Sequence, residues 1–139
     1  MTGGCGGDDG SGDRAEVLRR AQDRNAQLDL NLAFAVAKVY YVDHDAYTGF
    51  GVDEAATIEP SLTWSVATSA PSGEGAVAIA VAEGDFLLLL ADSLSGNTFC
   101  VGDDVMSVVS NVEVRGIGKA TTYEECEALP DWPAPTYST

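Results

Sequence analysis

The chain has 139 residues, an apolar share of 45% and a net charge of −15, from 7 basic and 22 acidic side chains. This length fits one domain with a tail, and the apolar share is sufficient for one hydrophobic core. Because the charge is strongly negative, the composition argues against nucleic acid and anionic lipid headgroups as partners.

Residues 1–12 consist mainly of glycine and aspartate, so we expect a flexible linker there. Cys5 follows Thr2-Gly3-Gly4, an order similar to the end of a bacterial lipoprotein signal, whose cysteine becomes lipidated. Cys5 is therefore a candidate lipidation site. The apolar segment that precedes such a cysteine is missing before Cys5, so either translation begins upstream of Met1 or the similarity arises by chance.

A single long helix is predicted over residues 13–44. Asp13 can accept hydrogen bonds from the first free backbone amides, and Glu16 can complete a capping box. Apolar or small residues then recur at alternating intervals of three and four, which places them on one face of the helix. These residues are Leu18, Ala21, Asn25, Leu28, Leu32, Ala35 and Val39, of which Asn25 is the one polar member.

The two halves of this helix differ in polarity. From Leu28 onward further residues widen the apolar face, and we expect this half to pack on the core. Those residues are Leu30, Phe34, Val36, Ala37, Tyr40 and Tyr41. The first half is mostly polar and is expected to project or to lie on the surface. Its arginines are Arg14, Arg19, Arg20 and Arg24. An ordinary amphipathic helix with a solvated first half is the alternative.

Strand patterns follow a connecting loop over residues 45–61. Two apolar segments flank Glu83-Gly84-Asp85, as in a β-hairpin. The predicted strands are 62–66, 76–81, 86–91 and 97–101; residues 106–114 are compatible with a strand or a short helix, and 123–129 with a helical turn. This order predicts an α+β fold, with one long N-terminal helix packed on an antiparallel sheet of about four strands. The globular domain would span residues 13–132, with an extended tail over 133–139.

Two of the three cysteines lie within the predicted domain. We expect Cys100, on a strand, and Cys126, near the C-terminal end, to form a disulfide that attaches the irregular C-terminal segment to the sheet. Closing this loop would stabilise the fold by about 3–4 kcal/mol in the chain-entropy model. A disulfide would also indicate an oxidising compartment outside the cytoplasm. The alternative is two separate buried thiols.

Four segments, taken in their order along the chain, resemble a known family. They are the helix over residues 20–41, Tyr47-Thr48-Gly49-Phe50, Ser95-Gly96-Asn97-Thr98-Phe99-Cys100, and Thr122-Tyr123-Glu124-Glu125-Cys126. Together they resemble the globular domain of type IV pilins and pseudopilins, in particular those of Gram-positive bacteria, over residues 14–132. The resemblance implies a helix packed on an antiparallel sheet and a C-terminal loop stapled by a disulfide. It also implies assembly into a pilus fibre, or into the pseudopilus of a secretion or DNA-uptake machine.

The sequence departs from this family at its N-terminal end. Family members begin with a basic leader, a cleavage site, a glutamate and a long apolar segment that anchors the subunit in the membrane and later forms the fibre core. In this chain the glycine-rich residues 1–12 occupy the position of that long apolar segment. The sequence contains no run of about 18 apolar residues that could span a bilayer. A pilin-like head on a lipid anchor and a truncated gene model are both consistent with this difference.

Candidate catalytic or metal sites are few. His44 is the single histidine, and we interpret it as a solvated residue at a helix end. Asp8-Asp9 and Asp103-Asp104 are acidic pairs that could bind calcium, but the first lacks the glutamate of a helix–loop–helix calcium loop, and solvated turns are the simpler interpretation. No catalytic serine motif or phosphate loop is present. We therefore expect no enzyme activity, no metal site and no cofactor.

These observations predict an extracytoplasmic assembly subunit, tethered to a membrane through its N-terminal end. Its partners would be like subunits, other pilins or secretion-machine proteins, bound through the helix face of residues 14–30 and through the C-terminal loop between the cysteines. The interaction helix contributes Arg14, Leu18, Arg19, Arg20, Ala21, Arg24, Asn25 and Leu28. The part of the chain after residue 38, which we call the head, has sixteen acidic residues and only two basic ones, Arg115 and Lys119. The basic helix of one copy would therefore attract the acidic head of another copy. The alternative is a lipid-anchored ligand-binding or adhesion lipoprotein that has a pilin-like head and forms no fibre.

Overall fold

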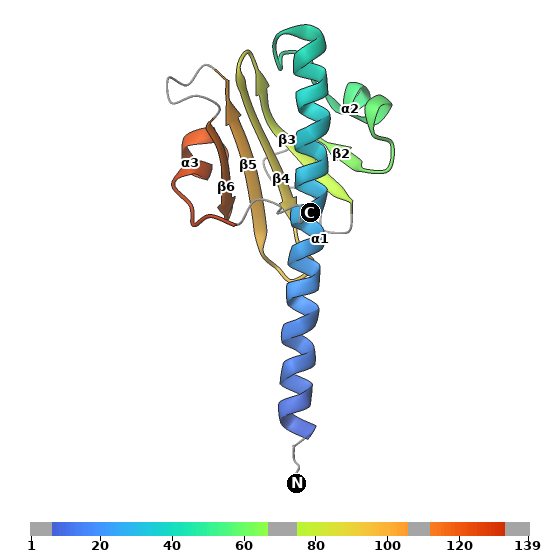
Figure 1. The fold of residues 1–139 in the computed structure, drawn as a ribbon, viewed down its shortest axis with the longest axis vertical. Coiled ribbons are helices and arrows are strands. Elements are labelled where there is room, and N and C mark those ends of the chain that lie inside the picture. Colours follow the sequence, from blue (N-terminus) through green and yellow to red (C-terminus); the bar gives the residue numbers. More distant parts are fainter. Residues whose placement is uncertain (1–6, 67–74, 106–111, 133–139) are drawn as a thin grey trace, which may run out of the picture.

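The computed structural model describes the backbone of residues 7–66, 75–105 and 112–132. It describes the side chains of residues 14–66, 75–105 and 113–132. Within these ranges a long helix, α1 (Gly7–His44), packs on a five-stranded sheet (Figure 1). The other elements are α2 (Val52–Ile58), β2 (Thr63–Ser65), β3 (Ala76–Glu83), β4 (Phe86–Asp92), β5 (Thr98–Asp104), β6 (Val112–Ile117) and α3 (Tyr123–Glu127). The predicted α+β class and the long first helix are confirmed.

The helix α1 ends at His44, as predicted, but it begins at Gly7 rather than at Asp13. The predicted linker is therefore helical from Gly7 onward, and Asp13 lies inside the helix, where it cannot be the N-cap. Glu16 pairs with Arg19 and Arg20 instead of completing a capping box. Once a helix is nucleated, each further residue adds one hydrogen bond, which allows extension into a segment whose glycines have low helix propensity.

The sheet has the order β2-β3-β4-β5-β6, and it is mixed rather than purely antiparallel. From β3 to β6 neighbouring strands are antiparallel, and the predicted hairpin is confirmed, with Glu83 opposite Phe86. The edge strand β2 is instead parallel to β3, with Thr63 opposite Ala76. The chain between these two strands is long enough to return to the same end of the sheet, whereas the two residues between Glu83 and Phe86 force a reversal.

Both faces of the sheet are covered. On one face α1 packs over residues such as Val77, Leu89 and Phe99. On the other face Leu88 and Leu90 pack with Cys126 and the segment around α3. Because β4 is central and covered on both sides, its four leucines, Leu87 to Leu90, are fully buried. The helix α2 was not predicted, because it has seven residues and only one of them, Ala55, is buried.

The predicted disulfide is confirmed. It attaches the C-terminal segment to the face of the sheet opposite α1, which we call the far face. Cys100 on β5 and Cys126 on α3 are bonded, with their Cα atoms 6.1 Å apart. A Cβ atom at Gly116 would lie 2.7 Å from the Cys126 carbonyl oxygen and 2.9 Å from the Cys100 Sγ, so β6 needs glycine at this position. The predicted helical turn over 123–129 is present as α3, whereas residues 106–111 and the tail 133–139 lie outside the described residues.

Candidate interaction surface

The helix α1 has two apolar faces, of which one packs on the sheet. The packed face consists of buried residues from its second half: Ala26, Leu30, Ala33, Phe34, Val36, Ala37 and Tyr40. The sequence prediction that the whole apolar stripe turns inward from Leu28 onward is therefore wrong for Leu28, Leu32 and the two stripe residues after them. It is correct for the residues that widen the stripe. The sequence of α1 contains more than one row of apolar residues, and the sheet covers only the broadest row.

We call the second face the outer stripe. It consists of residues at alternating intervals of three and four, all exposed: Leu18, Ala21, Asn25, Leu28, Leu32, Ala35, Val39 and Val42. Its large members are 57% (Leu18), 52% (Leu28), 40% (Leu32), 51% (Val39) and 80% (Val42) exposed. Single exposed apolar residues are ordinary on protein surfaces, but a continuous row along one helix is not.

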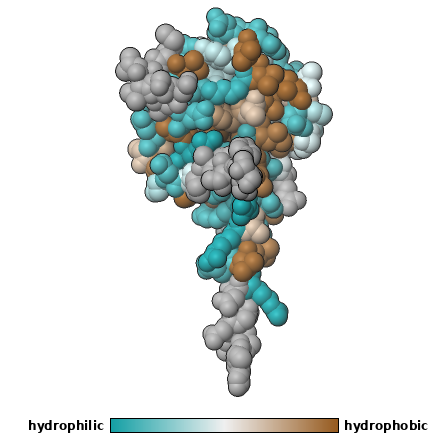
Figure 2. Space-filling model, viewed as in Figure 1, coloured by the Kyte–Doolittle hydropathy of each residue, from teal (hydrophilic) through white to brown (hydrophobic). Residues whose placement is uncertain are grey.

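The first half of α1 projects beyond the sheet, as predicted (Figure 1). From Arg14 to Asn25 its side chains are exposed or half-buried. Glu16 lies 3.4 Å from Arg20 and 4.0 Å from Arg19, and such exposed pairs contribute only tenths of a kcal/mol. Figure 2 shows hydrophobic atoms beside hydrophilic ones on this projecting part. The half-helix therefore presents both positive charge and apolar surface.

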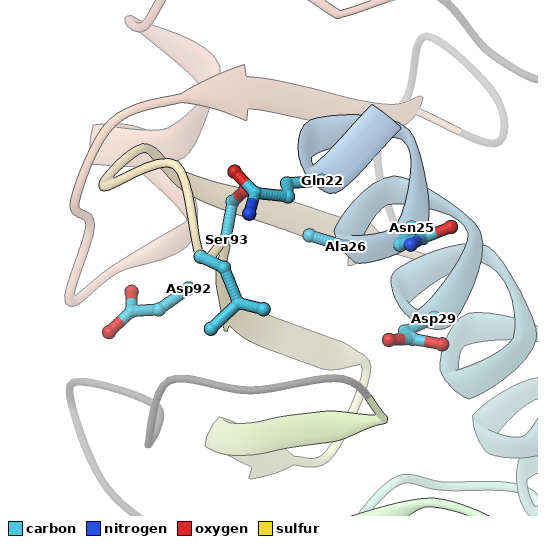
Figure 3. Close-up of a pocket in the computed structure, with 7 residues that line it drawn as sticks. Gln22, Asn25, Ala26, Asp29, Asp92 and Ser93 are labelled. Carbon is cyan, nitrogen blue, oxygen red and sulfur yellow. The ribbon is translucent and has the colours of Figure 1, made fainter. Parts of the chain in front are cut away.

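Polar contacts fix α1 where it leaves the sheet. Asp23 accepts hydrogen bonds from the Ser95 hydroxyl and, at 3.0 Å, from the Asn97 side-chain amide, while Asp29 accepts the Gly75 N–H at 2.7 Å. Figure 3 shows Asp29 on α1 across a small cavity from Asp92 at the end of β4. The cavity volume is about 10 Å³, roughly the space of one water molecule. This junction is thus a structural contact, too small to be a ligand site.

A buried ionic cluster connects the middle of α1 to the sheet. Asp103 on β5 is fully buried, lies 3.1 Å from the Lys38 Nζ and accepts a hydrogen bond of 2.5 Å from the Tyr47 hydroxyl. Its Oδ1 atom has no hydrogen-bond partner among the described residues. Glu113 adds a second carboxylate 3.7 Å from Lys38. The interpretation of Asp103 as a solvated turn residue is therefore wrong, because the strand β5 carries it into the core beneath α1.

Two tyrosines at this cluster have shifted ionisation. Burial, followed by the hydrogen bond to Asp103, raises the pKa of Tyr47 well above its ordinary value. Tyr41 donates a hydrogen bond of 2.7 Å to Asp85, and this bond is the main cause that raises the pKa of Tyr41 to about 12. The sequence contained Tyr41 and Tyr47 near the helix end, but nothing in it linked them to aspartates more than forty residues away.

The remaining candidate sites from the sequence are His44, Cys5 and the acidic pair Asp8-Asp9. His44 is exposed, stacks on the Tyr40 ring at 3.9 Å and lies with Nδ1 3.0 Å from the Tyr40 carbonyl oxygen. Among the described residues no group of histidine, cysteine or acidic side chains could hold a metal ion. Cys5 and the side chains of Asp8 and Asp9 lie outside the described part of the chain. No helix in the described ranges is both long and apolar enough to cross a membrane.

No protein-family model, curated protein or solved structure matches the chain.

Proposed function

We propose that this chain is a pilin-like assembly subunit, which acts by protein–protein association in a type IV pilus or a type II secretion-like pseudopilus and has no enzyme activity. The observation that carries the proposal is the projecting first half of α1, which extends beyond the sheet (Figure 1) and whose side chains from Arg14 to Asn25 are exposed or half-buried. A half-helix that buries no face within its own fold is well suited to contacts with other subunits.

Charge supports contacts between copies of this chain. The projecting half carries Arg14, Arg19, Arg20 and Arg24, whereas the rest of the molecule is strongly acidic. A basic helix of one copy would lie favourably against the acidic head of the next. Such a head-to-tail contact uses two different surfaces, so it continues from copy to copy as a fibre requires, provided that the rotation between copies does not close a ring.

The disulfide supports a location outside the cytoplasm. Cys100 and Cys126 are bonded and fully buried, and stable disulfides of this kind belong to oxidising compartments. The bond between Cys100 and Cys126 fixes the C-terminal segment, which is the second surface that we expect to contact neighbouring subunits. Partners would be like subunits or other proteins of the same machine.

The test is the self-association of the purified full chain, measured by sedimentation over a range of protein and salt concentrations. We expect assemblies larger than a dimer at low salt, which disappear as salt screens the charges or when Arg19→Glu and Arg20→Glu are combined. Lys119→Glu is the control, because it reverses an exposed charge on the head. Assemblies that survive both the charge reversal and high salt would contradict the charge-driven contact.

Analysis of the protein from its native cells tests the pilin-like assignment itself. A processed, methylated apolar segment upstream of Met1, found by mass spectrometry, would support a pilin or pseudopilin. A diacylglyceryl group on Cys5 would instead indicate the alternative, a lipoprotein with a pilin-like head. An unmodified Met1 in the soluble fraction, together with reduced cysteines, would contradict both.

A further inference from the structure

We infer that the outer stripe of α1 is the seam of a parallel two-stranded coiled coil, in which α1 of a second copy of this chain packs in register. The inference rests on the proposed role of α1 in subunit association, and it specifies the partner and the geometry. The two contacts share Arg24, but Arg19 and Arg20, which the charge-reversal variants change, lie at positions b and c, outside the seam, so the two contacts can be tested separately.

The spacing of the outer stripe is that of a heptad repeat. With Leu18 at position a, the a positions are Leu18, Asn25, Leu32 and Val39, and the d positions are Ala21, Leu28, Ala35 and Val42. The repeat is therefore unbroken over about three and a half heptads, the length at which heptads indicate a coiled coil rather than a chance row. All eight residues are exposed within the single chain. Arg14, at the next d position toward the N-terminus, ends the apolar row.

The width of the stripe also distinguishes it from the packed face. A helix that packs on a globular core has a broad apolar face, whereas a coiled-coil seam is limited to positions a and d. The packed face of α1 is broad, with Phe34 and Val36 beside its central row. The outer stripe is narrow, since charged residues stand beside it at Arg24, Asp29 and Asp43.

Charges beside the stripe favour the parallel orientation. In a parallel pair each g residue faces the following e residue of the other helix, which brings Arg24 to Asp29 of the second copy and Lys38 to Asp43 of the second copy. The other two g–e pairs are uncharged. An antiparallel pair would bring g residues together and e residues together, so that basic would face basic and acidic would face acidic.

Arg24 contributes most to this orientation. It is exposed and forms no ion pair with any described residue, whereas Lys38 is already bound to Asp103. Asp29 accepts the Gly75 N–H, and a carboxylate can accept more than one hydrogen bond. Asn25 adds selectivity, because an asparagine at position a is best placed opposite the same residue of a parallel, in-register partner.

The first experiment measures the mass of the full chain by sedimentation equilibrium at moderate salt, where charge-driven contacts are screened. We expect twice the monomer mass of 14.5 kDa. Leu28→Asp should raise the dissociation constant of this dimer at least about 100-fold, because both copies lose a buried leucine at the seam. Phe86→Asp is the matched control, since Phe86 is also a large exposed apolar residue (41%) but packs against Tyr123 of α3, on the face of the sheet opposite α1. It should leave the dimer unchanged.

The second experiment tests orientation in a Cys5→Ser background. Leu18→Cys and Val39→Cys, examined separately under mild oxidation, should each give a cross-linked dimer, because residues at position a meet their own counterparts in a parallel pair. These positions lie about 32 Å apart along the helix, so no antiparallel arrangement joins both to themselves. Arg20→Cys, exposed at position c, is the control and should not cross-link. Failure of either stripe variant overturns the parallel arrangement.

The outcomes separate this inference from the proposed charged contact. Loss of dimers in Leu28→Asp, with no effect of Arg19→Glu and Arg20→Glu on larger assemblies, supports the coiled coil and contradicts the charged contact. A dimer that persists in folded Leu28→Asp and Leu32→Asp overturns the coiled coil, whatever the charge variants do. A wild-type chain that remains monomeric at every concentration and salt overturns both.

Discussion

The packed face of α1 and its outer stripe are both rows of apolar residues, and they differ in what stands beside each row. The packed face is broad and meets the sheet at Leu30 and Phe34, both buried. The outer stripe is one row wide, bordered by charged residues, and exposed at Leu28 and Leu32. Because both rows alternate intervals of three and four, period alone does not distinguish them. The width of an apolar face is the better guide to whether a sheet or a single helix covers it.

The largest test of this comparison places the same mutation on each face. Leu30→Ala should lower the free energy of unfolding by about 3–5 kcal/mol, because it removes a fully buried side chain and leaves a cavity. Leu32→Ala, two residues away, should change it by less than about 0.5 kcal/mol when the chain is monomeric. Denaturant unfolding at low protein concentration measures both. Equal losses would mean that the outer stripe is part of the core of the single chain.

Removing the disulfide tests whether the stripe is independent of the far face of the sheet. The double change Cys100→Ala and Cys126→Ala should lower the free energy of unfolding by about 3–4 kcal/mol, since it releases the loop between them. The dimer constant at the outer stripe should stay the same at temperatures where the variant is folded. Denaturant unfolding and sedimentation provide the two readings, with disulfide-bonded wild-type protein as the reference and reduced wild-type protein as a control that should lose as much stability as the variant. A weakened dimer would show that the stripe depends on the far face.

Breaking the ionic cluster tests what holds the packed face in place. Lys38→Met should cost about 2–3 kcal/mol, less than a fully buried pair, because Lys38 is partly exposed while Asp103 is left charged and buried. Combining Lys38→Met with Asp103→Asn should recover part of this loss, since no uncompensated charge remains. The free energy of unfolding at neutral pH distinguishes the two variants. If the double variant is less stable than Lys38→Met alone, the stability lost in Lys38→Met does not come from leaving the buried Asp103 carboxylate without a partner.

High pH should lower the free energy of unfolding through Tyr47, which belongs to the same cluster as Asp103. The pKa of Tyr47 is raised in the folded protein, so its neutral form stabilises the fold fully below the unfolded value of about 10. As pH rises above about 10, the unfolded chain loses this proton first, and stability should fall by up to about 1.4 kcal/mol per pH unit from this group. Tyr47→Phe should remove that part of the slope. Unfolding measured from pH 9 to 11 checks it, and an unchanged slope would contradict the assignment.

The smallest effect is expected on the projecting half. Glu16→Gln removes the pairs with Arg19 and Arg20, and it should lower stability by less than about 0.5 kcal/mol, because all three side chains are exposed. Helix content by circular dichroism and unfolding by denaturant measure this change. A loss of several kcal/mol would mean that the projecting half packs within its own chain, contrary to Figure 1.

Local signals predicted much of this fold. The end of the helix at His44 and the hairpin at Gly84 follow from patterns within a few residues, and the pairing of Cys100 with Cys126 follows because these two cysteines lie within the predicted domain. The helix start was missed because capping preferences are weak compared with the cooperativity of a long helix. The parallel pairing of β2 was missed because it depends on where a long connection returns.

The contacts of the interaction surface were less predictable. Asp103 and Lys38 are far apart in the sequence, and two adjacent aspartates are typical of a solvated turn. Only the strand β5 places Asp103 beneath α1. The apolar row itself was recognised correctly, but its partner was misassigned. Amphipathic patterns show that a face is apolar, and only the three-dimensional arrangement shows which apolar face is already covered.

The covering of β4 has a consequence for how this protein is made. Leu87 to Leu90 form a fully buried strand, and one of its two covers, the segment around α3, is synthesised after it. Until that later segment has emerged and docked, a four-leucine strand remains open to water on one face, as in aggregation-prone folding intermediates. Biogenesis therefore has a vulnerable interval, between the synthesis of β4 and the closure of Cys126 onto Cys100, in which a holding chaperone and a thiol oxidant would increase the yield of folded protein.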